Sequence, residues 1–304
     1  MVDAVRAHAA ISTRGLSKDY GSGRGLFALD LEVERGEVFG FLGPNGAGKS
    51  TTMRLLLDLV KPTSGSASIL GLDSRAESRE IRRHVGFLPG DFALYPRLTG
   101  ATVLDYLAEL RGGVDRRLRD SLAERLDAEL NRPIRELSTG NRQKLGLIQA
   151  FMHDPELLIL DEPIAGLDPL VQQSFHALLA EASARGRTVF LSSHTLSEVE
   201  RVTHRVAILR GGRLVVVDSL ENLRKVAVQR LEIEFSEPVP AEQFRDLPGV
   251  REAKADGRHL IVAFEGSADA VVKAAAAHEV RAIRTHEEDL EEIFLRYYRD
   301  EGSS

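Results

Sequence analysis

The sequence predicts an α/β fold with a mixed or parallel sheet at its core, followed by a small α+β domain. Three observations lead to this prediction. An apolar run at Val38–Leu42 passes through a glycine-rich turn into a helix-forming segment. Two further apolar runs, Glu156–Leu160 and Thr188–Leu191, have the composition of buried strands. The tail beyond about residue 228 shows a β-α-β-β-α-β order, which is typical of a ferredoxin-like domain.

Composition limits the class of protein. The chain has 304 residues, of which 43% are hydrophobic and 28% charged, so it is globular and long enough for one large or two modest domains. No apolar run approaches the ~18–20 residues of a membrane-spanning helix, and the N-terminus lacks a secretory apolar region, so we expect a cytoplasmic protein. The absence of cysteine excludes disulfides and thiolate metal sites. A net charge of −6 gives no electrostatic case for nucleic-acid binding.

The first elements are two short strands, Ala10–Leu16 and Phe27–Val33, on either side of a turn-rich segment. Together they suggest a small β lobe laid against the core. Tyr20 lies in the turn between them. An exposed aromatic ring shortly upstream of a nucleotide loop could stack on adenine, or it could be an ordinary packing tyrosine.

The glycine-rich turn fits the phosphate-loop pattern G-x-x-x-x-G-K-[ST], or Walker A. Its glycines let backbone N–H groups approach a polyphosphate, and the following helix directs its positive end at the same charge. Lys49 is expected to reach the β- and γ-phosphates, and the Ser50 hydroxyl to bind Mg²⁺. The residues predicted to bind a nucleoside triphosphate here are Gly43, Pro44, Asn45, Gly46, Ala47, Gly48, Lys49, Ser50 and Thr51.

The helix that starts at Lys49 is expected to run to about Val60 and to be followed by strand-like pieces at Thr63–Leu72 and Val85–Leu88. The charged segment Asp73–His84 separates these two pieces and carries no assigned element. The next turn, which holds two prolines, is unusually apolar. It is a candidate contact surface formed by Phe92, Leu94 and Tyr95.

Residues 99–154 read as helical, because three segments carry apolar residues at a spacing near 3.6: Thr102–Leu110, Asp115–Leu130 and Asn141–Met152. Ser138 and Gly140 immediately precede the third segment. A serine cap and a glycine at a helix start form a second anion-binding N-terminus, although capped helices are common.

Two adjacent carboxylates, Asp161 and Glu162, end the strand at residues 156–160. Carboxylates at the end of a core strand are costly unless they have a task. In a phosphate-loop fold Asp161 would hold Mg²⁺, and Glu162 would orient or deprotonate a water for in-line attack. The alternative is a solvated acidic loop. His194 follows the next core strand, where it could donate a hydrogen bond to the γ-phosphate or be a capping or surface residue. A hairpin around Gly211–Gly212 closes this part of the chain.

These residues together resemble the ATPase subunit of ABC transporters. The resemblance covers roughly residues 10–220 and rests on the order and spacing of Tyr20, GPNGAGKS (43–50), LSTGN (137–141), LLILDEP (157–163), AGLD (165–168) and SSH (192–194). It implies that Tyr20 stacks on adenine, that Glu162 is the catalytic base and that His194 is the switch histidine. It also implies that Asp168 is the interface aspartate of the D-loop.

The resemblance further implies a role for LSTGN, which takes the place of the usual signature motif LSGGQ. Ser138 and Gly140 would bind the γ-phosphate of the ATP held by a partner subunit. Thr139 and Asn141 depart from the family pattern. Gly90 also departs from it, because the family normally has a glutamine there that contacts Mg²⁺ or the attacking water. That role is vacant here or is taken by Asp91.

The tail is expected to contain strands and helices in the order Leu231–Phe235, Ala241–Leu247, Val250–Ala255, His259–Phe264, Ala268–His278 and Val280–Thr285. The segment Asp289–Leu295 resembles the C-terminal end of drug- and antibiotic-exporter ATPases of the ABC-2 type. We therefore expect an ATPase domain at residues 10–222, with a helical subdomain at about 90–154, and an accessory domain at 228–304. Regulation or dimerisation by the tail is a hypothesis by analogy, and a spacer is the alternative.

The resemblance as a whole implies a subunit that binds and hydrolyses ATP with Mg²⁺ and forms a homodimer around two ATP molecules. It would drive an integral-membrane permease on a separate chain, as an exporter of a drug, antibiotic or other hydrophobic compound, from the inner face of the cell membrane. One alternative is a soluble ABC ATPase of translation or DNA repair, but these usually carry two ATPase cores or a long coiled-coil insertion. A second alternative is a silent regulatory module, against which the intact Lys49, Asp161, Glu162 and His194 argue.

Overall fold

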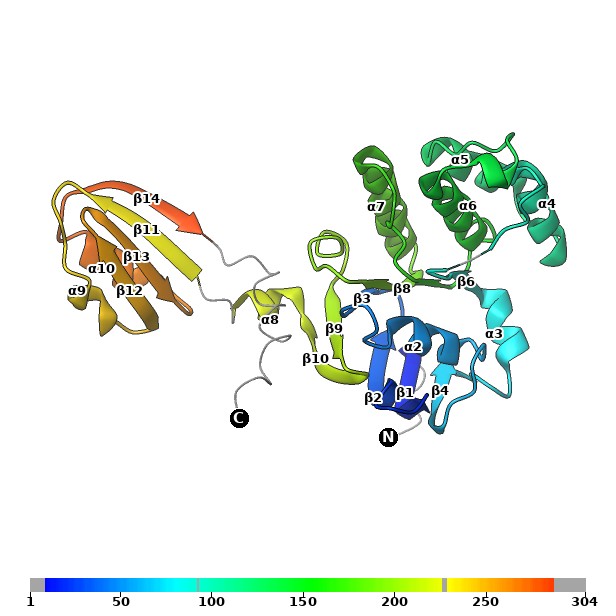
Figure 1. The fold of residues 1–304 in the computed structure, drawn as a ribbon, viewed down its shortest axis with the longest axis horizontal. Coiled ribbons are helices and arrows are strands. Elements are labelled where there is room, and N and C mark those ends of the chain that lie inside the picture. Colours follow the sequence, from blue (N-terminus) through cyan, green and yellow to red (C-terminus); the bar gives the residue numbers. More distant parts are fainter. Residues whose placement is uncertain (1–8, 92, 226–228, 287–304) are drawn as a thin grey trace. The chain divides into compact units, whose positions relative to one another are not determined.

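The computed structural model describes residues 9–91, 93–225 and 229–286. These residues fall into two compact units that divide between Val217 and Asp218. The first unit contains two sheets and the second contains one (Figure 1), and each unit has its own buried core. Phe92, residues 226–228 and the segment Asp289–Leu295 lie outside the described residues.

The core of the first unit is a six-stranded sheet in the order β10-β9-β3-β8-β7-β6. Every residue of the central strands β3, β7 and β8 is buried, as expected for strands covered on both faces. The pairs β3–β8, β3–β9, β7–β8 and β6–β7 are all parallel. The strands are β3 (Val38–Leu42), β6 (Val85–Leu88), β7 (Leu157–Leu160), β8 (Thr188–Ser193), β9 (Arg205–Arg210) and β10 (Arg213–Ser219).

The predicted β lobe is a second, antiparallel sheet in the order β2-β1-β4-β5. Its strands are β1 (Ala9–Asp19), β2 (Gly25–Glu34), β4 (Ser64–Ile69) and β5 (Leu72–Asp73). The lobe shares one apolar core with β3 and helix α2 (Lys49–Leu56). The helix is shorter than predicted, because it ends at Leu56 and Asp58 then takes a left-handed conformation at φ 53°.

Helices α6 and α7 lie on one face of the six-stranded sheet, and α2 with the β lobe lies on the other (Figure 1). Helices α4 and α5 pack against α6. Among the helices of the first unit, α3 and α7 occupy segments for which the sequence predicted no element. The helices are α3 (Ser78–His84), α4 (Gly100–Leu110), α5 (Arg116–Arg125), the short 3₁₀ helix η1 (Ile134–Glu136), α6 (Thr139–Phe151) and α7 (Pro169–Ala184).

Helix α5 ends well before the predicted Leu130, because the loop that follows it is hydrogen-bonded to helix α6. Asp127 takes a left-handed conformation at φ 49°, and the loop that follows is held by a side chain of α6. Asn141 accepts a hydrogen bond from the Glu129 backbone N–H (2.8 Å) and donates one to the Glu129 carbonyl (2.9 Å). The loop is thus paired with Asn141 instead of continuing the helical ladder.

The second unit confirms the predicted β-α-β-β-α-β order. Its sheet is antiparallel in the order β12-β13-β11-β14, and its buried core includes Phe244 and Val271 from the two helices that follow β11 and β13. Both helices are shorter than predicted. The elements are α8 (Leu220–Lys225), β11 (Gln229–Phe235), α9 (Glu242–Arg245), β12 (Val250–Asp256), β13 (His259–Phe264), α10 (Asp269–Ala275) and β14 (Val280–His286).

Within the described part of the chain, none of the helices has both the length and the apolar character needed to cross a bilayer.

His153, just after α6, connects the helical region to the core sheet. Its Nε2 lies 3.2 Å from the Val85 carbonyl oxygen in β6. Burial, and secondly the positive charge of Arg111, lower the pKa of this imidazole from 6.5 to about 4. The folded protein therefore resists protonating a group that the unfolded chain protonates more readily.

We expect His153 to make the protein less stable in mild acid. Its contribution is present above the unfolded pKa of 6.5 and is lost as the pH falls towards 4, by at most about 2 kcal/mol between pH 7 and pH 5. His153→Gln keeps a donor for the Val85 carbonyl but does not titrate. Urea unfolding at the two pH values should show a smaller loss of stability for this variant, and equal losses for both proteins would contradict the assignment.

Candidate nucleotide site

The loop between β3 and α2 has a backbone that only glycine can follow at two points. A β-carbon at Gly43 would lie 2.5 Å from the Leu209 carbonyl oxygen of β9. Gly48 caps the start of α2 at φ 109°, a left-handed conformation. All the predicted loop residues from Gly43 to Gly48 thus form the turn, while Lys49, Ser50 and Thr51 form the first turn of α2. This geometry directs the positive end of a helix into the loop, as phosphate binding requires.

Lys49 is buried, with 6% of its side chain exposed, and it curls back over the loop. Its Nζ donates to the carbonyl oxygens of Gly43 (2.5 Å) and Pro44 (3.3 Å). The same nitrogen lies 3.1 Å from Oε1 of Glu162, which is an ion pair without a well-directed hydrogen bond. The lysine therefore connects the phosphate loop directly to the carboxylate at the end of β7.

One hydroxyl from β8 bonds both acidic residues at the end of β7, one through its carboxylate and the other through its backbone. Ser192 Oγ donates to Asp161 Oδ1 (2.6 Å) and accepts a hydrogen bond from the Glu162 backbone N–H (3.0 Å). The Asp161 side chain is buried, and its backbone N–H donates to the Leu88 carbonyl oxygen at the end of β6. The structure therefore does not show a solvated acidic loop, the alternative that the sequence left open.

The Glu162 carboxylate lies between the side chains of Lys49 and His194. Oε2 lies 2.8 Å from His194 Nδ1, while Oε1 faces Lys49. The Glu162 backbone takes φ 49°, a left-handed conformation that is unfavourable for a residue with a side chain. The parallel sheet thus brings Lys49, Asp161, Glu162 and His194 to one edge, as the motifs predict.

Gly90 lies beside this cluster. A β-carbon there would be 3.0 Å from Asp161 Oδ2, tighter than ordinary packing. Asp91 is exposed. A side chain at the position after Pro89 would therefore require the Asp161 carboxylate to shift slightly.

Tyr20 lies on the turn between β1 and β2, with half of its surface exposed. The Lys18 ammonium stands 5.4 Å from the centroid of its ring. The turn adjoins the phosphate loop, since the Gly25 carbonyl oxygen would be 3.2 Å from a β-carbon at Gly48. Half of this residue is thus exposed, on a turn whose end at Gly25 contacts the phosphate loop.

Ser138, Gly140 and Asp168 line a separate hollow, which Lys49 and Glu162 do not line. Ser138 caps α6 and accepts the Asn141 N–H (3.1 Å), as expected for a capped helix start. Asp168 caps α7 by accepting from the Leu170 and Val171 N–H groups. A β-carbon at Gly140 would lie 2.5 Å from the Gly166 carbonyl oxygen, so the start of α6 is in close contact with the turn that precedes α7.

Two residues of the site were missed by the sequence analysis. Ser192 belongs to the SSH motif, and a hydroxyl directly after the buried apolar run Val189–Leu191 is a signal that could have found it. Gln143 lies on α6 and donates to the carbonyl oxygens of Glu162 (3.1 Å) and Pro163 (3.0 Å). No local pattern predicts a contact across that distance in sequence.

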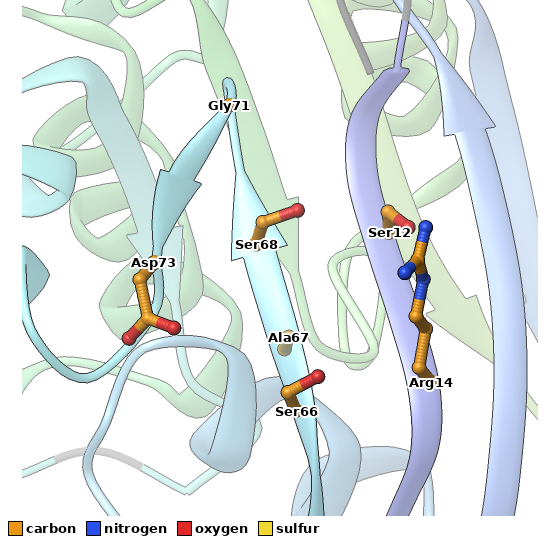
Figure 2. Close-up of a pocket in the computed structure, with 7 residues that line it drawn as sticks. All are labelled: Ser12, Arg14, Ser66, Ala67, Ser68, Gly71 and Asp73. Carbon is orange, nitrogen blue, oxygen red and sulfur yellow. The ribbon is translucent and has the colours of Figure 1, made fainter. Parts of the chain in front are cut away.

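Another hollow lies on the outer face of the β lobe (Figure 2). Ser12 and Arg14 of β1 face Ser68 and Ser66 of β4, their cross-strand neighbours. Gly71, Ala67 and Asp73 complete its lining. None of the phosphate-loop or carboxylate residues lines this hollow, so we assign it no part in the chemistry above.

Comparison with known proteins gives a consistent result. Residues 26–165 match the family model described as ABC transporter. The bacitracin transport ATP-binding protein BcrA of Bacillus licheniformis is 38% identical over 230 residues, which cover 75% of each chain. The Nod factor export ATP-binding protein I of Rhizobium etli is 37% identical over 211 residues, covering 68% of this chain and 67% of that protein.

Solved structures share the fold of the first unit. The structure of an ATP-binding subunit of an ABC transporter matches with a TM-score of 0.64 and 31% identity, over 71% of this chain and 92% of that chain. The dimeric structure of a bacterial ABC transporter cassette matches with a TM-score of 0.61 and 25% identity, over 69% of this chain and 98% of that chain.

Proposed function

The chain belongs to the ABC transporter family of ATP-binding proteins, and on this premise we propose which residues perform its ATP hydrolysis and what that hydrolysis drives. The observation that carries the proposal is that the Glu162 carboxylate lies between His194 and Lys49, the lysine of the phosphate loop. A regulatory module without activity would have no need for a carboxylate in that position. Relatives named for transport also disfavour a role in translation or DNA repair.

Each side chain has a distinct task in the proposed mechanism. Lys49 and the loop N–H groups bind the β- and γ-phosphates, and Tyr20 stacks on adenine. Glu162 accepts the proton of the attacking water, while His194 donates a hydrogen bond to the γ-phosphate. Ser50 and the buried Asp161 are oxygen ligands of the kind that Mg²⁺ prefers, and Mg²⁺ would neutralise charge on the phosphates.

We further propose that two copies close around two ATP molecules, with Ser138, Gly140 and Asp168 of one copy facing the nucleotide of the other. Three observations support this arrangement: the separate hollow at the start of α6, the helix N-terminus there, and the similarity to a dimeric cassette. The transport path would belong to an integral-membrane permease on another chain, at the inner face of the membrane. Bacitracin transport and Nod factor export in the relatives favour export of a drug, antibiotic or other hydrophobic compound.

The permease would dock on an exposed apolar surface of the helical region. Tyr95 and Tyr106 are 54% and 42% exposed and pack edge to face at 6.0 Å, with the exposed Leu98 and Leu110 in the same subdomain. Monomeric surfaces rarely group such side chains without a partner. Leu94 is only partly exposed. Tyr95 is thus the best supported of the three residues that the sequence proposed for this surface.

Replacing Tyr95 and Leu98 together by serine tests the proposal. In cells that also make the permease, we expect copurification with it to fall about tenfold, the effect of losing ~1.4 kcal/mol of contact. ATP affinity and the thermal midpoint of the isolated protein should remain near the parent values. Leu59→Ser, an exposed leucine after α2, is the matched control. Unchanged copurification would move the docking surface elsewhere, and a lost fold would place these side chains in the core.

A further inference from the structure

Gln143 carries a buried amide whose two N–H groups donate to the turn that contains Glu162. Only 8% of the residue is exposed, and its Nε2 donates to two consecutive carbonyl oxygens, those of Glu162 and Pro163. A primary amide has two donors, so this side chain can serve both acceptors at once. The two contacts fix the direction of the peptide units on the C-terminal side of Glu162.

The turn needs such support because its conformation is intrinsically unfavourable. Glu162 has φ 49°, which residues other than glycine, asparagine and aspartate seldom adopt. Its backbone N–H is held by Ser192 from β8, and its carbonyl is held by Gln143 from α6. Bonds on both sides of the α-carbon therefore define where the carboxylate points, towards Lys49 and His194.

We propose that Gln143 is a positioning residue that holds Glu162 in line for proton abstraction and couples helix α6 to hydrolysis in its own subunit. This inference rests on the proposed catalytic role of Glu162. Gln143 stands in the second turn of the helix that Ser138 caps, and Gly140 of the same helix touches the Gly166 carbonyl. A nucleotide contact at the start of α6 thus acts on the base of the subunit that makes the contact.

The first test is Gln143→Met, which keeps the length of the side chain and removes the donors. We expect kcat for ATP hydrolysis to fall about tenfold or more, with KM and ATP affinity near the parent values, because the defect is one of alignment. Gln149→Met on the same helix is the matched control, since the hydrogen bonds described for the Glu162 turn come from Gln143 and Ser192. A parent-like kcat in Gln143→Met would overturn the proposal.

Two further measurements separate positioning from a general loss of structure. In single-turnover assays, adding Gln143→Met to Glu162→Gln should cause little extra loss, because the group being aligned is already gone. Full multiplication of the two losses would overturn the proposal.

Gln143→Glu should recover activity as the pH is lowered from about 8 to about 6, since a protonated carboxyl can donate one of the two hydrogen bonds. If this variant folds and shows only the pH profile of the parent, the proposal also fails.

The same experiments distinguish this inference from the proposed function. If the parent hydrolyses ATP and Glu162→Gln does not, the catalytic role of Glu162 stands whatever Gln143→Met does. If the parent and Glu162→Gln hydrolyse ATP equally, Glu162 is not the base, and the positioning role of Gln143 falls with it.

Discussion

Glu162→Gln is expected to lower the rate of ATP hydrolysis by about 10²-fold or more, a typical contribution of a general base. The amide has the shape of the carboxylate and lies within reach of His194, but it cannot take the proton of the attacking water. ATP binding should be retained, because the loop and Lys49 are unchanged. The variant should therefore accumulate as an ATP-bound dimer, which size-exclusion chromatography with ATP would detect.

Phosphate release at saturating ATP measures the loss, and Glu156→Gln is the matched control. Glu156 immediately precedes the same strand but pairs with Arg35 (3.6 Å) and His84 (2.9 Å), away from the phosphate loop. Its replacement should leave turnover near the parent value. Near-normal turnover in Glu162→Gln would remove this carboxylate from the mechanism and leave His194 as the candidate to test next.

The second large effect is recovery of activity when two inactive proteins are mixed. Lys49→Ala disables the phosphate loop, and Ser138→Arg disables the start of α6. In a mixed dimer one site carries both defects, while the other combines an intact loop with an intact helix start. Single-turnover hydrolysis should therefore reappear, up to one site per mixed dimer. A single-turnover assay is needed because, if continued cycling requires two working sites, steady-state turnover stays absent even when one site cleaves its ATP.

Ser138 is the better residue for this experiment than Gly140. Ser138 is exposed, whereas Gly140 is so close to the Gly166 carbonyl that any side chain would disturb the subunit itself. Ser138→Ala is the control for the cap, whose loss costs about 1 kcal/mol of helix stability without adding bulk. If mixed dimers form and bind ATP yet show no recovered cleavage, the assignment of Ser138 to the partner's nucleotide is wrong.

The sequence predicted the parts of the fold that are encoded locally. The central strands appear as apolar runs, and the phosphate loop is a contiguous motif, so both were found with nearly correct bounds. Helix α3 was missed because Ile81 is its one buried residue and no apolar stripe exists. Exposed pairs between Glu80 and Arg83 or His84 support it instead.

Helix α7 is a different case. Asp168 and Pro169 mark its start, and Val171, Phe175, Leu178 and Ala182 form a buried stripe at helical spacing. These residues are sufficient to predict the helix from the sequence. Hydrogen bonds between distant elements form the other class of missed features. The bonds from Ser192 to Asp161 and from Gln143 to Glu162 depend on the packing of whole elements, and no local pattern contains that information.

The bonds from Asn141 to Glu129 have a consequence for protein engineering. Changing LSTGN to the more usual LSGGQ looks like a conservative repair of a five-residue motif. A glutamine at position 141 is one methylene longer and could not meet both the N–H and the carbonyl of Glu129 at their present distances. The motif and residues 127–131 would have to be exchanged together. A functional transplant between proteins therefore needs both segments, because the short motif alone would lose its hydrogen-bond partner.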